Sequence, residues 1–269
     1  MFIPLHDANK LKHISHPYVN YVIIAANIII WLISSSPALV DPETAKRAAI
    51  SFGFIPSVIN NMAELPLEFV VIPEKFTYVS YAFLHANFMH LAGNMLFIWV
   101  FGDNIEDAMG HLRYIIFYLL CAAGAAFFHA LVAQNSNAPL IGASGAAAGI
   151  VAAYLILHPN VRIWILALGR IPLRIPAYIV LGAWIAFQLW NFVTNSGDQV
   201  SWAAHIGGLI AGAILIFPFK RKNVPLFDRG PDAATPSSPT TPSSPTTPSS
   251  EASHAEKTPP EPPSFKWGR

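Results

Sequence analysis

Residues 142–157 read GASGAAAGIVAAYLIL, and this stretch decides the fold class of the chain. It contains no charged residue, and Ser144 stands where its apolar run begins. A second junction of the same kind, AHIGG at residues 204–208, opens an apolar run that reaches Phe219. Apolar runs of this type indicate membrane helices. We therefore predict two membrane helices, each with a polar side chain, Ser144 or His205, at its start.

The composition extends this prediction to most of the chain. Of the 269 residues, 54% are hydrophobic and 12% are charged, and the mean hydropathy is +0.45. A soluble domain carries about 25% charged residues. Six blocks approach the length that crosses a membrane, at about residues 18–33, 88–102, 114–133, 144–157, 175–190 and 203–219. We predict an all-α membrane protein in which residues 18–220 form a bundle of six transmembrane helices.

The loops between these blocks differ in charge, and the difference predicts the topology. Lysine and arginine occur before the first block, after the second, after the fourth and after the sixth. The loop between the third and fourth blocks has no charged residue, and the loop between the fifth and sixth has only Asp198. Basic loops stay in the cytoplasm, so both chain termini are predicted to be cytoplasmic. The helices that begin at Ser144 and near His205 then both enter the membrane from the outside. The two side chains are expected at the same depth.

The two ends of the chain lie outside the predicted bundle. Residues 1–17 form a short cytoplasmic segment. Residues 221–269 form a tail in which the sequence TPSSPT occurs twice in succession from Thr235. Because proline, serine and threonine cannot pack a hydrophobic core, this tail is predicted to be disordered.

Several classes of function are disfavoured by the sequence. The formal net charge of +1 gives no basic surface for nucleic acid. The single cysteine, Cys121, excludes an internal disulfide and a CxxC metal site. No HExxH, paired-aspartate or phosphate-loop pattern occurs, and His129 and His158 are interpreted as structural. No metal and no cofactor are expected.

Ser144 and His205 suggest a nucleophile and its base. A serine hydroxyl is a weak nucleophile until a base removes its proton, and histidine is the usual base. Placed at one depth by two neighbouring helices, the pair would suit a serine hydrolase that works inside the bilayer.

Glycines explain how these two helices could approach each other. Gly145 and Gly149 lie four residues apart on the first helix, and Gly208 and Gly212 lie four apart on the second. Each pair forms a face of small residues, which lets helix backbones pack closely in lipid. The same pattern also occurs in ordinary helix packing. Here the packing interpretation and the catalytic interpretation support one another, because close packing would bring Ser144 and His205 together.

His90 and Asn94 share one face of the second predicted helix, because they are four residues apart. They could donate hydrogen bonds to a developing oxyanion, together with the backbone N–H of Ser144. They could equally link two helices by hydrogen bonds. The residues alone leave both alternatives open.

The pattern as a whole resembles the rhomboid family of intramembrane serine proteases. The matching stretches are HANFMHLAGN at residues 85–94, GASG at 142–145 and AHIGG at 204–208, with GDNIED at 102–107 and LHP at 157–159 in addition. The resemblance covers roughly residues 70–220. Two positions depart from the family: residues 74–78 lack a Trp-Arg pair, and Ala148 replaces an aromatic on which the histidine base of some members stacks.

The resemblance implies a function and a set of roles. Ser144 would attack the scissile carbonyl, and His205 would act as base and then as acid, without a third acidic residue. His90, Asn94 and the N–H of Ser144 would form the oxyanion hole. The resemblance implies a structural role for His85 and a helix-capping role for Glu106. Structural support is also expected from Gly142 and from the four helix glycines. The substrates would be single-span membrane proteins, cleaved at or near the outer face of a membrane that we expect to be a bacterial plasma membrane.

Two other functions remain as alternatives. A relative without activity could bind and sort membrane clients, but such a protein would be expected to lose Ser144 or His205. A channel or transporter could contain a proton or metal path formed by His85, His90, His129 and His205. That class often contains internal repeats, and none is visible in this sequence.

Overall fold

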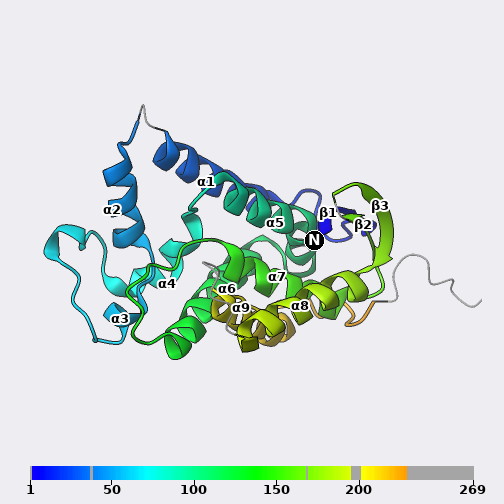
Figure 1. Ribbon diagram of the computed structural model, residues 1–269. Helices are drawn as coiled ribbons and strands as arrows, with labels where there is room; N and C mark the ends of the chain where they lie inside the picture. The colour runs from blue at the N-terminus through cyan, green and yellow to red at the C-terminus, as the bar shows by residue number, and fades with distance from the viewer. Residues whose placement is uncertain (1, 37–38, 168, 195–200, 229–269) are drawn as a thin grey trace, which may run out of the picture. The chain divides into compact units, whose positions relative to one another are not determined.

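The computed structural model describes residues 2–36, 39–167, 169–194 and 201–228. Within them, the long helices occur where the sequence predicts them (Figure 1). They are α1 (Tyr18–Ser35), α5 (Phe88–Met109), α6 (His111–Val132), α7 (Ser144–Leu157), α8 (Ala177–Thr194) and α9 (Trp202–Phe219). Helices α1, α6, α8 and α9 are long and apolar enough to cross a membrane, whereas α7 is an apolar helix of 14 residues. The helical membrane fold is therefore confirmed, while the count of six crossings stays a prediction.

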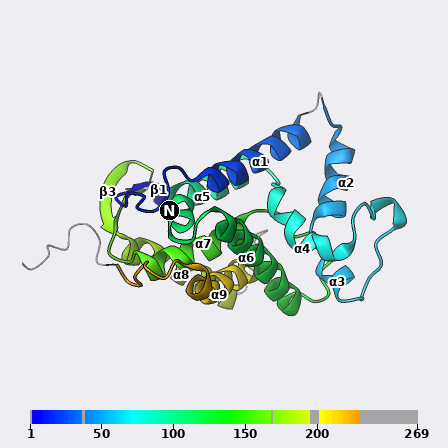
Figure 2. The same cartoon turned by 180° about the vertical axis from the view of Figure 1, so that it is seen from behind.

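Helix α7 lies among the other long helices and packs against α5, α6, α8 and α9 (Figures 1 and 2). Its buried residues are mostly alanine and glycine, so neighbouring backbones come close to it on several sides. A short apolar helix with so little exposed surface needs no lipid contact along its length. This explains why the helix that begins with Ser144 can lie within the bundle although it has only 14 residues.

The cytoplasmic end predicted from the charge pattern contains a small antiparallel sheet. It consists of β1 (Phe2–Asp7), β2 (Arg162–Ala167) and β3 (Ile171–Pro176), in the order β1-β2-β3 (Figure 1). The all-α description of the fold is corrected by this sheet. Strands β2 and β3 pair as a hairpin, with Ala167 opposite Ile171, and β1 adds to it from the other end of the sequence, with Phe2 opposite Ala167.

Asp7 connects the sheet to the helices. Its carboxylate Oδ2 accepts hydrogen bonds from Tyr154 Oη at 2.6 Å and from Asn104 Nδ2 at 2.9 Å. Tyr154 belongs to α7 and Asn104 to α5. The N-terminal strand is thus joined to the helix that Ser144 begins.

Glu106 has no solvent exposure and caps α1. Its two carboxylate oxygens accept the backbone N–H groups of Val19 and Asn20, at 3.0 and 2.7 Å, in the first turn of that helix. These are donors that a helix leaves without an intrahelical partner, and a carboxylate there also complements the helix dipole. The structure therefore contains the helix-capping role expected for Glu106.

Residues 39–83 form short elements between α1 and α5. These are α2 (Pro42–Phe52), α3 (Pro56–Ile59), η1 (Leu67–Phe69), η2 (Glu74–Phe76), α4 (Thr77–Ser80) and η3 (Tyr81–Phe83). Phe54 exchanges backbone hydrogen bonds with Leu140, just before α7. The segment is thereby anchored to the loop that leads to Ser144.

The chain remains packed for some residues beyond the predicted boundary at 220. The backbone N–H of Arg221 donates to Ala108 O at 2.8 Å, and those of Phe227 and Asp228 donate to Ile156 O and Leu157 O at 2.9 and 2.8 Å. The rest of the predicted tail, residues 229–269, lies outside the described residues.

Candidate active site

Ser144 is the first residue of α7, and the turn before it requires a glycine. Gly142 has φ +120°, a conformation that a side chain would strain. A Cβ at Gly142 would lie 2.5 Å from Nε2 of His90 and 3.6 Å from Nδ2 of Asn94. The absence of a side chain at Gly142 therefore lets the polar groups of α5 lie directly against the start of α7.

His85 holds this arrangement together. Asn94 Nδ2 lies 2.9 Å from His85 Nε2, and the backbone N–H of Ala143 donates to the same nitrogen at 3.4 Å. The His85 and His90 rings meet edge to face, with centroids 5.1 Å apart. Burial lowers the pKa of His85 to about 4, so the ring is neutral at neutral pH and the single lone pair of Nε2 can accept, shared between the two donors. One N–H of the Asn94 amide is used by His85, which leaves the other for a ligand.

His205 lies in the first turn of α9. Ser201 caps that helix, since its Oγ accepts the N–H of Ala204 at 3.3 Å, and the same hydroxyl lies 2.9 Å from His129 Nδ1. His129 thus connects α6 to the start of α9, in line with its structural interpretation. Nδ1 of His205 lies 2.7 Å from Oε1 of Gln188 on α8.

The glycines lie at the contact between α7 and α9. A Cβ at Gly208 would overlap the carbonyl oxygen of Gly145, and one at Gly212 would overlap that of Gly149. Such a contact is possible only between backbones without side chains. It brings the first turn of α9, which carries His205, against the first turn of α7.

The structure therefore places the predicted residues in one region of the protein. The turn that precedes α7 lies against three polar side chains, those of His85, His90 and Asn94. The first turns of α7 and α9 are in contact at their glycines. Within the described residues, no hydrogen bond joins the Ser144 hydroxyl to His205. Catalytic hydrogen bonds are often long before substrate binds, so this geometry is compatible with a dyad.

Two neighbours of His205, Gln188 and Trp184, were not singled out by the sequence. An amide and a tryptophan in an apolar helix give little signal unless the helix packed against them is known. Their spacing of four residues, which places them on one helix face, is the signal that could have drawn attention to them.

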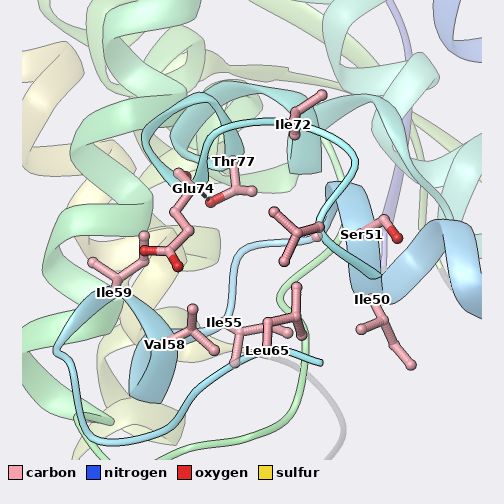
Figure 3. A pocket seen from close by; sticks show the side chains of 11 residues that line it. Ile50, Ser51, Ile55, Val58, Ile59, Leu65, Ile72, Glu74 and Thr77 are labelled. Atoms are coloured by element: carbon pink, nitrogen blue, oxygen red, sulfur yellow. Dashed lines mark hydrogen bonds between the residues drawn. The ribbon is translucent and has the colours of Figure 1, made fainter. Parts of the chain in front are cut away.

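A cavity elsewhere in the protein is too small for a substrate. It lies in the segment between α1 and α5, has a volume of about 20 Å³ and contains none of the candidate residues (Figure 3). Such a volume holds about one water molecule. Its lining consists of Ile50, Ser51, Gly53, Ile55, Val58, Ile59, Leu65, Val70, Ile72, Glu74 and Thr77. Among the described residues, no group of three or more His, Cys, Asp or Glu side chains is placed to hold a metal ion.

Comparison with known proteins identifies relatives of this chain. A model of the Rhomboid domain matches residues 73–222. Rhomboid protease AarA of Providencia stuartii is 35% identical over 147 residues, which cover 49% of this chain and 51% of the relative. Rhomboid protein 1, mitochondrial, of Saccharomyces cerevisiae is 28% identical over 155 residues, 53% of this chain and 41% of the relative. Rhomboid-like protein 11, chloroplastic, of Arabidopsis thaliana is 28% identical over 153 residues, 54% of this chain and 52% of the relative. The chain spans about half the length of these relatives.

Proposed function

Because the chain belongs to the rhomboid family, we propose that it is an intramembrane serine endopeptidase with Ser144 as nucleophile and His205 as base. One observation carries the proposal. The glycine contact between α7 and α9 brings the helix start with Ser144 against the helix turn with His205. A relative named as a protease, AarA, supports the same activity.

The reaction would proceed by acyl transfer. Ser144 Oγ attacks the scissile carbonyl carbon while Nε2 of His205 takes the hydroxyl proton. The tetrahedral intermediate collapses, the C–N bond breaks, and His205 returns the proton to the leaving amine. A water molecule, deprotonated by His205, then hydrolyses the acyl-enzyme and restores Ser144.

The oxyanion would be stabilised by His90, Asn94 and the backbone N–H of Ser144. Gly142 supports this assignment, because its missing side chain leaves the His90 ring against the turn that precedes Ser144. His85 supports it as well, since the bond to its Nε2 fixes the amide of Asn94. Donors that are fixed before the reaction need no reorganisation in the transition state, which is the main source of their catalytic effect.

The protein is an integral membrane protein, and its proposed substrates are single-span membrane proteins cleaved at or near the outer face. In the proposed topology, with six crossings and both termini in the cytoplasm, α7 and α9 both begin on the outer side. Some relatives carry mitochondrial or chloroplastic in their names, and AarA comes from a bacterium. We propose a bacterial plasma membrane for this chain.

Fluorophosphonate labelling of the full chain in detergent tests the proposal. Such a probe reacts with a serine that a base has activated. We expect labelling of the wild type and none of Ser144→Ala or His205→Ala. Ser136→Ala and His16→Ala, which change a loop serine and a histidine before α1, serve as matched controls that keep labelling. A folded wild type that does not react would exclude the protease and favour the client-binding alternative, whereas a Ser144→Ala variant that reacts would exclude Ser144 as the nucleophile.

A further inference from the structure

Helix α8 contains two buried side-chain amides, Gln188 and Asn191, and Gln188 is the more deeply buried of the two. Gln188 is 3% exposed, in a helix that is apolar enough to cross a membrane. An amide removed from water costs free energy unless it finds a hydrogen-bond partner, so a polar side chain inside such a helix suggests a function. The partner of its Oε1 is Nδ1 of His205, at 2.7 Å.

This bond determines where the proton of the His205 ring lies. The amide oxygen Oε1 has no hydrogen and can only accept, so Nδ1 of the histidine must donate. In the neutral ring, the other nitrogen, Nε2, then carries a lone pair. This is the form of histidine that can take a proton from Ser144.

The same bond also responds to the reaction. When His205 becomes a cation, its Nδ1–H becomes a stronger donor, and the bond to Oε1 strengthens because charge-assisted hydrogen bonds are about twice as strong as neutral ones. An aspartate at this position would stabilise the cation more, but its own charge would have to be buried. An amide fixes the ring without adding a buried charge.

Trp184 lies one helical turn before Gln188 and covers the same ring. The Trp184 and His205 rings are stacked, with centroids 6.4 Å apart and an interplanar angle of 27°. Ala148 packs in one apolar cluster with Trp184. The aromatic ring that stacks on His205 thus comes from α8, whereas some members of the family have an aromatic on α7 itself.

We propose that Gln188 is a positioning residue that fixes the tautomer and orientation of His205, with Trp184 supporting the ring from the same face of α8. The proposal rests on the proposed function, because it assigns to Gln188 an effect on the Ser144–His205 dyad. The site then has a third member, the neutral side chain of Gln188 on α8, beside Ser144 on α7 and His205 on α9.

The test is the rate of fluorophosphonate labelling between pH 5 and pH 9 for the full chain in detergent. Gln188→Leu removes the acceptor at similar volume, Gln188→Glu keeps an acceptor and adds a charge, and Gln134→Leu is the control in a loop. We expect Gln188→Leu to label about 100-fold more slowly, the effect of a misplaced catalytic group. We expect Gln188→Glu to recover at least a tenth of the wild-type rate and to move the midpoint of the pH profile upward, because a carboxylate favours the cation of His205.

The outcomes distinguish failure of the proposed function from failure of the role of Gln188. A wild type that never labels would refute the proposed function, and the role of Gln188 with it. A wild type that labels through Ser144, together with a Gln188→Leu variant of unchanged rate and profile, would refute the role of Gln188 alone. If Gln188→Leu does not fold, the profile of Gln188→Glu decides, since an unmoved midpoint would show that residue 188 does not act on His205.

Discussion

Substitution of Gly212 by alanine should separate α9 from α7. The added Cβ would lie 2.5 Å from Cα and 2.6 Å from the carbonyl carbon of Gly149 and would overlap its oxygen. Non-bonded carbon atoms prefer about 3.5 Å or more, so the helices must move apart by about 1 Å. Overpacking typically costs about 1–3 kcal/mol, and a clash with backbone should reach the upper end. For a chain of this size, about 3 kcal/mol corresponds to a fall in melting temperature of about 6–12 °C.

The single cysteine provides the assay. Cys121 is completely buried, so a thiol-reactive dye that fluoresces on reaction reports unfolding of the detergent-solubilised protein. Gly182→Ala on α8 is the control, because a Cβ there meets nothing within 4 Å and alanine is the better helix former by about 1 kcal/mol. If Gly212→Ala melts at the temperature of Gly182→Ala, the close approach of the two helices is wrong.

Three further predictions concern charge, catalysis and capping. Burial raises the pKa of Asp7 to about 7, above its unfolded value near 4, so the stability that its protonated form contributes is present at low pH and is lost as the pH rises through 7. The melting temperature of Asp7→Asn minus that of the wild type should therefore be larger at pH 8 than at pH 5. An equal difference at the two pH values would contradict this. Asn94→Ala should lower the labelling rate about 100- to 1000-fold, the usual effect of removing one oxyanion donor; a rate within threefold of wild type would remove Asn94 from the site. Glu106→Gln should lower the free energy of unfolding by about 1–3 kcal/mol, because the N–H groups of Val19 and Asn20 lose a charged acceptor, and unchanged thermal unfolding would argue against the cap.

The sequence predicted helices well where an apolar run and its polar boundary coincide. Helix α7 has the predicted bounds, 144–157, because small apolar residues continue without interruption from Ser144. Helix α5 extends to Met109, seven residues beyond the predicted end. Its last turns contain Glu106 and Asp107, which read as a loop in isolation but accept the backbone N–H groups of Val19 and Ile14 in the fold.

The sheet and the neighbours of His205 were missed for a common reason. Strand β1 is paired with residues about 160 positions later in the chain, and the bond between Gln188 and His205 joins two helices whose relative rotation no local pattern encodes. Periodicity shows which face of an element is apolar, but not which face of another element it meets. By contrast, the glycine pairs were informative, because a face without side chains predicts close approach whatever its partner.

The sheet also constrains the order in which the protein can be assembled during synthesis. Strand β1 leaves the ribosome long before β2, since Phe2 pairs with Ala167. At about 5–20 residues per second, the first strand waits roughly 8–33 s for its partner. During this interval several helices have already been made, while the hydrogen-bonding groups of β1 and the carboxylate of Asp7 lack their final partners. Closure of the sheet is therefore a late event in biogenesis, and the N-terminal strand can take its place only after α7 has been synthesised.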